Sequence, residues 1–105
     1  MDDVLLVRVK GEMDLATADE LRRAIDKKME GENRHLLLNL SHVSFIDSSG
    51  VGVILGRYRS IARRGGRMAI VQPQPQVKRV LEIAGLSRLV CFCCSEREAL
   101  YLLHN

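Results

Sequence analysis

The sequence predicts a single α/β domain in which helices cover a mostly parallel sheet. The chain has 105 residues, of which 47% are apolar and 28% charged, and this composition suits one globular domain with its own core. Short apolar segments alternate with segments whose apolar residues recur at helical spacing, in the order βαβαβαβα. Strands that are separated by crossover helices pair in parallel. We therefore expect one domain over residues 1–105.

The first third of the chain predicts a strand, a helix and a second strand. Val4 to Lys10 is rich in β-branched residues with one polar side, and Gly11 marks its end. Thr17 with Glu20 three residues later is a capping-box pattern, and apolar residues at helical spacing follow it. His35 to Leu40 contains three leucines in succession, which is typical of a central parallel strand buried on both faces.

The middle of the chain predicts a second helix and a third strand. The helix should begin near Ser48 or Ser49, because apolar residues recur at helical spacing from there on. Gly65 and Gly66 should end it. Met68 to Val71 is then a short apolar segment of the length expected for a buried strand.

The last third predicts a helix, a strand and a short C-terminal helix. Pro75 suits the first turn of a helix that stops at Gly85. Leu89 to Cys93 supplies the last strand, and Ser95 with Glu98 forms a second capping box. The three cysteines at positions 91, 93 and 94 have no distant partner, so we expect neither a disulfide nor a metal site but small apolar core residues.

Charge and hydropathy limit the possible partners. A formal net charge of +3 is a mild excess that does not specify nucleic acid, and few aromatic residues accompany the basic ones. The sequence has no apolar run of about 18 residues, and its acidic N-terminus does not resemble a signal peptide. We expect a cytoplasmic protein that binds neither a membrane nor nucleic acid directly.

The segment from Asp47 to Gly52 joins a buried strand to the start of a helix, where sites form in open α/β sheets. Unpaired backbone N–H groups and the positive end of the helix dipole suit an anionic oxygen or a phosphate there. Alternatively, Ser48 or Ser49 merely caps the helix, and Asp47 favours the same end electrostatically. The segment alone does not decide between these interpretations.

The outward face of this helix carries small residues where a solvated helix normally has Glu or Lys: Ser49, Gly52, Val53, Gly56 and Ser60. Each interior glycine costs about 1 kcal/mol relative to alanine. One hypothesis is that the face is kept flat for another protein, with Val53 as an apolar contact. The alternative is that the glycines pack against a loop of the same chain.

Two enzymatic or ligand-binding motifs fit poorly. Gly50, Gly52 and Gly56 form G-x-G-x-x-x-G, one residue longer than the dinucleotide fingerprint, and no acidic residue follows at the ribose-binding distance. A hydrolase that uses Ser48 or Ser49 as its nucleophile would need G-x-S-x-G or a histidine in a recognisable context, and neither is present.

Several segments together resemble a known family: Gly11–Asp14, Leu38–Leu40, Phe45–Tyr58, Val77–Arg79 and Ala84–Leu86. They closely resemble the bacterial anti-sigma factor antagonists of the STAS domain class, and within that class the sporulation group that antagonises the anti-sigma-F factor. The resemblance covers almost the whole chain. It implies a single STAS domain, with Asp-Ser-Ser-Gly as the regulatory motif.

The resemblance also implies a mechanism of partner switching. The unmodified chain would bind an anti-sigma factor that is also a serine kinase carrying ATP and Mg²⁺, and thereby free the sigma factor. Phosphorylation of Ser48 would release it, and a phosphatase would restore it. The chain itself would need no cofactor and would not be an enzyme. The partner-binding residues implied are Glu12, Asp14, Asp47, Ser49, Gly52, Val53 and Gly56. A STAS-type sensor that binds a nucleotide or small ligand is the alternative.

Overall fold

Four parallel strands form one sheet, in the order β1-β2-β3-β4. The computed structural model describes residues 3–31 and 33–104. Within them the strands are β1 (Val4–Met13), β2 (His35–Ile46), β3 (Met68–Val71) and β4 (Cys91–Cys93). All three neighbouring pairs are parallel, which confirms the predicted sheet.

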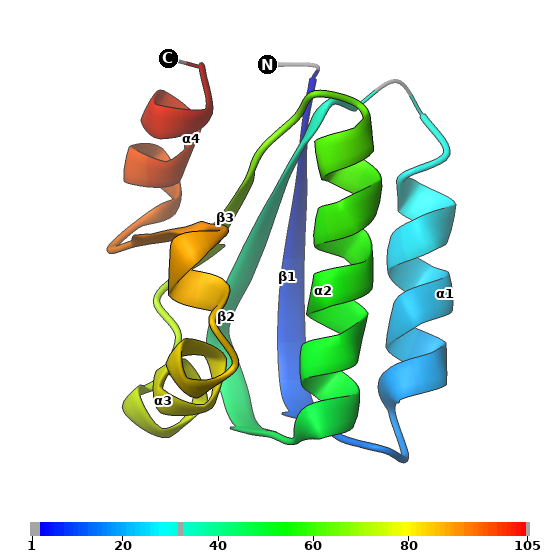
Figure 1. Cartoon of the computed structure of the whole chain (residues 1–105), viewed down its shortest axis with the longest axis vertical. Helices are drawn as coiled ribbons and strands as arrows, with labels where there is room; N and C mark the ends of the chain where they lie inside the picture. The colour runs from blue at the N-terminus through cyan, green and yellow to red at the C-terminus, as the bar shows by residue number, and fades with distance from the viewer. Residues whose placement is uncertain (1–2, 32, 105) are drawn as a thin grey trace.

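A helix follows each strand, so the predicted order βαβαβαβα is confirmed. The helices are α1 (Ala18–Lys28), α2 (Ser48–Arg63), α3 (Pro75–Ile83) and α4 (Glu96–His104), with a short 3-10 turn, η1 (Leu86–Arg88), before β4. Figure 1 shows that α1 and α2 stand side by side and that both begin at the same end of the molecule. The start of β1 and the end of α4 lie at the opposite end.

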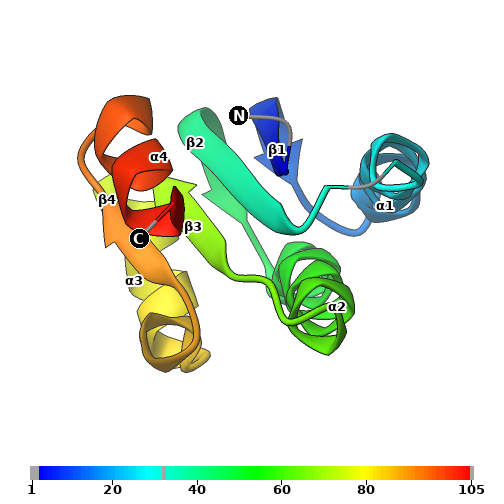
Figure 2. The ribbon, with the colours of Figure 1, turned by 90° about the horizontal axis from the view of Figure 1, so that it is seen from above.

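The helices cover the two faces of the sheet unequally. Helices α1, α2 and α3 pack on one face and share the larger core, whereas α4 covers the other face over a smaller core, as the view from above shows (Figure 2). Strand β2 lies between β1 and β3, with Leu36 and Leu38 in the larger core and Leu37 in the smaller one. All three leucines are fully buried, so the prediction of a central strand buried on both faces is confirmed.

Strands β1 and β2 are longer than predicted. β1 continues past Gly11, which has a φ of 88° and lies beside an irregularity in the register. Beyond it, Glu12 pairs with Phe45 and Met13 with Ile46. The glycine therefore does not end the strand but lets it bend there, and both strands run on to a common edge.

One of the two predicted capping boxes is wrong. Thr17 makes no side-chain cap bond to α1; its Oγ1 donates instead to the Glu12 carbonyl at 2.8 Å. Half of the capping box before α4 is confirmed, because Ser95 Oγ accepts from the Glu98 N–H at 3.0 Å. The Glu98 carboxylate in turn accepts from the Cys94 N–H at 2.9 Å.

The cysteines differ in environment. Cys93 is buried in the smaller core, as expected, but Cys91 and Cys94 are exposed, so the prediction of core residues is wrong for these two. All three are free thiols. None of the helices in the described part of the chain is long and apolar enough to cross a membrane.

Candidate functional site

The carboxyl ends of β1 and β2 meet at one edge of the sheet, and the turn after β1 packs directly against the start of α2. The Asp47 N–H donates to the Met13 carbonyl at 3.1 Å. Gly50 lies against the same carbonyl, because a Cβ added at Gly50 would be 2.3 Å from the Met13 oxygen. Only a glycine fits there without a shift of the backbone, so this position fixes how closely the turn approaches the helix.

Asp47, and neither serine, caps helix α2. Its Oδ1 accepts from the backbone N–H groups of Ser49 at 2.8 Å and Gly50 at 3.2 Å. Its Oδ2 accepts from the Leu15 N–H at 3.3 Å. The alternative interpretation, in which Ser48 or Ser49 supplies the cap, is therefore wrong.

Ser48 is the first residue of α2, and its side chain is free. The residue is exposed, and no described group forms a hydrogen bond with its hydroxyl. Ser49 is half-buried, and its N–H is bound by Asp47. Of the two serines, Ser48 is the more exposed.

The acidic residues of the turn after β1 have different environments. The Asp14 carboxylate accepts from the Thr17 N–H at 3.1 Å, and the Asp14 N–H donates to Thr17 Oγ1 at 3.0 Å. Asp14 is half-buried and holds the turn in shape. Glu12 is exposed, and no described side chain pairs with its carboxylate. Glu12 is therefore the freer of the two acidic groups.

The outward face of α2 is open at its glycines. A Cβ added at Gly52 or Gly56 would meet nothing within 4 Å, so the alternative that these glycines pack against a loop of the same chain is wrong. Gly52 is exposed and Gly56 half-buried. Val53 is only 5% exposed and belongs to the larger core. The prediction that Val53 lies on this outward face is wrong, because its position turns toward the sheet.

Two exposed apolar side chains beside this site were not predicted. Leu15, whose N–H donates to Asp47, is 78% exposed. Phe45, which pairs with Glu12 in the sheet, is 47% exposed. The sequence signals the exposure of Leu15 in one way: this leucine stands in a polar turn, between Asp14 and Thr17. Sequence periodicity misses Phe45, because it assigns this residue to a connection and not to β2.

The edge thus combines a free hydroxyl, acidic groups, exposed apolar side chains and an open helix face. No group of three or more His, Cys, Asp or Glu residues within 3–31 and 33–104 is arranged to hold a metal ion. The arrangement suits contact with another macromolecule, since exposed apolar side chains among polar ones are typical of interaction surfaces.

Comparison with known proteins identifies relatives over nearly the whole chain. The STAS domain family model matches residues 1–99. An anti-sigma F factor antagonist of Paenibacillus polymyxa is 41% identical over 98 residues, which are 92% of this chain and 84% of the relative. The solved structure of the anti-sigma factor antagonist SpoIIAA in its unphosphorylated form has a TM-score of 0.82 and 31% identity, over 95% of this chain and 87% of that chain. The Bacillus cell fate determinant SpoIIAA in the phosphorylated form has a TM-score of 0.74 and 30% identity, over 95% and 90%.

Proposed function

The chain belongs to the STAS domain family and, within it, to the anti-sigma factor antagonists, and on this premise we propose that it is a regulator switched by phosphorylation of Ser48. The unmodified chain binds an anti-sigma factor that is also a serine kinase carrying ATP and Mg²⁺, and so frees a sigma factor of the sporulation type. Phosphorylation of Ser48 by the kinase releases the chain, and a phosphatase reverses it. The chemistry belongs to these partners and not to the chain.

The free hydroxyl of Ser48 is the observation that carries this proposal. A kinase needs a serine whose oxygen can reach the γ-phosphate, and Ser48 is exposed and has no hydrogen-bond partner among the described residues. Asp47 caps α2 in its place, so modification of Ser48 removes no bond that holds the helix. One of the structural relatives is itself a phosphorylated form. The fold therefore needs no rearrangement to accept the phosphate.

Electrostatic repulsion and desolvation explain how the phosphate releases the partner. A phosphate on Ser48 adds about −1.5 to −2 charges at pH 7. In the free chain water solvates it at the start of α2. In the complex it lies beside the Asp47 carboxylate, and burying it unpaired costs several kcal/mol. Because about 1.4 kcal/mol changes an affinity tenfold, that cost is large enough to separate the partners.

The docking surface that we propose surrounds Ser48, and its members are the residues at this edge that another protein can touch. Gly52 and Gly56 allow a partner's backbone to approach α2, and the energetic cost of two glycines in a helix supports this use. Leu15 adds an apolar contact. Val53 is left out because it is buried. The members are Glu12, Leu15, Phe45, Ser49, Gly52 and Gly56, with Asp14 and Asp47 holding the turn and the helix start.

Residues 1–105 act as one STAS domain in the cytoplasm, where sigma factors and their regulators meet. The switch involves neither direct binding of nucleic acid nor a membrane.

The test compares three variants in the presence of the cognate kinase and Mg-ATP. Intact-protein mass should rise by one phosphate for the wild type and for the matched control Ser49→Ala, and should not change for Ser48→Ala. Binding of the kinase should be retained by Ser48→Ala and strongly weakened in Ser48→Asp, whose carboxylate imitates part of the phosphate charge. Modification of Ser48→Ala would overturn the site assignment. Absence of both modification and binding in the wild type would overturn the function.

A further inference from the structure

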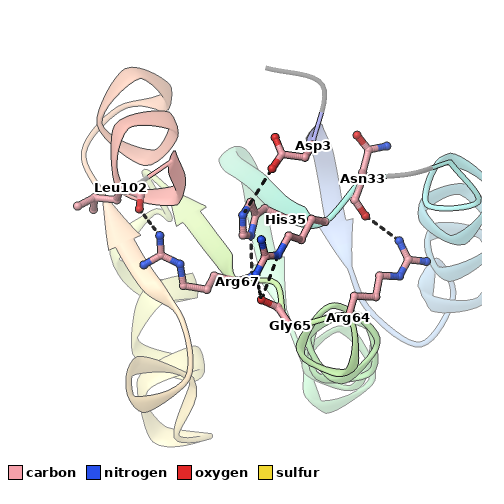
Figure 3. A network of polar contacts seen from close by, with 8 residues as sticks. Asp3, Asn33, His35, Arg64, Gly65, Arg67 and Leu102 are labelled. Carbon is pink, nitrogen blue, oxygen red and sulfur yellow. Dashed lines mark hydrogen bonds and ion pairs between the residues drawn. The ribbon is translucent and has the colours of Figure 1, made fainter.

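A hollow at the amino ends of β2 and β3 lies at the opposite end of the sheet from Ser48. Its volume is about 320 Å³. Of the residues that the structure describes, two arginines and two histidines line it, Arg34, His35, Arg67 and His104, together with the carboxylate of Asp3. Figure 3 shows Asp3 directed at His35 and Arg67 directed at the carbonyl of Leu102. Among the described residues, the lining therefore has two guanidinium groups against one carboxylate.

The two arginines are held in place by backbone carbonyls. Arg34 donates to the Gly65 carbonyl through Nε at 3.3 Å and Nη2 at 3.1 Å. Arg67 donates to the Leu102 carbonyl through Nη2. Within the described part of the chain, neither guanidinium forms an ion pair with a carboxylate. Each charge is thus tethered to a backbone carbonyl and has no carboxylate partner among the described residues. Each guanidinium has five N–H donors, of which these bonds use only one or two.

His35 adds a directed donor to the same hollow. Its Nδ1 accepts from the Arg67 N–H at 2.9 Å, so in the neutral ring the proton is on Nε2. Nε2 lies 4.0 Å from Asp3 Oδ2, which is too far for a hydrogen bond. His35 as a residue is 7% exposed. A ligand that enters the hollow therefore meets an N–H group that has no acceptor of its own among the described residues.

We propose that this hollow binds a small phosphate-bearing anion. Guanidinium groups match the oxygens of a phosphate through paired N–H donors, and the fixed arginines lose little freedom on binding. The volume falls at the lower end of the range for small-molecule sites. Helix-end capping accounts for the bond of Arg34 to Gly65, but it does not account for the remaining donors, or for the convergence of a second arginine and His35. The site is independent of the Ser48 switch.

The test titrates ¹⁵N-labelled full-length protein with pyrophosphate and, at equal ionic strength, with sodium chloride. Pyrophosphate should cause saturable shifts of the amides of Arg34, His35 and Arg67 that chloride does not cause. The double variant Arg34→Gln with Arg67→Gln should bind at least about tenfold more weakly. The matched control, Arg59→Gln with Arg63→Gln, removes the same charge from the exposed side of α2 and should bind as the wild type does.

A second variant keeps the test decisive if the arginine variants unfold. Asp3→Asn removes the acidic group that lines the hollow among the described residues and should tighten pyrophosphate binding, whereas a purely structural role for Asp3 predicts no such gain. Equal shifts in chloride, equal weakening in the control variant, or no gain in Asp3→Asn would each overturn the proposal. Tighter binding of a poly-glutamate peptide than of pyrophosphate would do the same, because it would identify the basic lining as a contact for an acidic protein.

Discussion

The Asp47 carboxylate accepts a hydrogen bond from the Leu15 N–H at 3.3 Å, while its other oxygen binds the first turn of α2. One side chain thus fixes both the turn after β1 and the start of the helix that carries Ser48. The two segments are 32 residues apart in sequence. A group added at Ser48 is therefore placed beside two segments that one carboxylate holds together.

Replacing Asp47 tests this double role. Asp47→Ala removes the cap and leaves the Leu15 N–H without its acceptor, and we expect the free energy of unfolding to fall by about 1–2 kcal/mol. Asp47→Asn keeps an oxygen that can accept and should lose less. Urea denaturation of the three proteins measures the difference. Equal stability of Asp47→Ala and wild type would contradict the geometry described for the cap.

The glycines of α2 provide a matched pair. In Gly50→Ala the new Cβ would lie 2.3 Å from the Met13 carbonyl, so the variant should be destabilised by several kcal/mol or fail to fold. In Gly52→Ala the new Cβ meets nothing within 4 Å, so stability should rise by about 1 kcal/mol. If Gly52 contacts the kinase, the same variant should bind it more weakly. Thermal unfolding and a binding assay check both effects, and a Gly52→Ala variant with unchanged kinase affinity would remove Gly52 from the docking surface.

The order of elements could be predicted because its signals are local. The leucines of β2, the proline at the start of α3 and the glycines after α2 each act on their own segment. The capping residues of α1 and α2 were harder to predict, because several neighbouring polar side chains can form the cap hydrogen bond. Asp47, and not Ser48, caps α2, and the Thr17 hydroxyl donates to the Glu12 carbonyl instead of capping α1.

The candidate site was predicted in part for a similar reason. The motif points to Ser48, whose role stays a prediction. The exposure of Leu15 and the burial of Val53 depend on how the turn and helix pack on the sheet. The basic residues around the end of α2 also have tertiary roles that sequence does not reveal. Arg57 pairs with Asp26 of α1 at 2.9 Å, and Arg64 donates to the carbonyls of Asn33 and Met29.

The three cysteines should react at different rates. Burial raises the pKa of the Cys93 thiol to about 11, and the residue is 4% exposed. Because the thiolate is the reactive form, iodoacetamide at pH 8 should label Cys91 and Cys94 in the native protein and Cys93 only after unfolding. Peptide mass spectrometry distinguishes the sites. Rapid labelling of Cys93 in the folded protein would show that the smaller core opens easily.

The ion pair between α4 and β1 should weaken in acid. Hydrogen bonds from Arg8 and then Asn39 lower the pKa of Glu96 to about 2 from its ordinary value of 4.5. A lowered carboxyl pKa stabilises the fold above the unfolded pKa, and this contribution is lost as the pH falls toward the folded pKa. The difference in unfolding free energy between wild type and Glu96→Gln should therefore be constant above about pH 5 and shrink from pH 4.5 toward 2. A difference that stays constant down to about pH 2 would contradict the lowered pKa of Glu96.

His35 should give the protein a second pH dependence, near neutrality. Burial lowers the pKa of its imidazole, and Arg34, Arg67 and His104 lower it further against the opposing effect of Asp3. The unfolded histidine titrates near about pH 6.5, so below that pH the unfolded chain binds a proton that the folded chain does not. The free energy of unfolding should therefore fall as the pH drops from about 7 to 5. His35→Gln, which can still accept from the Arg67 N–H, should flatten this slope. A slope that persists in His35→Gln would assign the effect to another group.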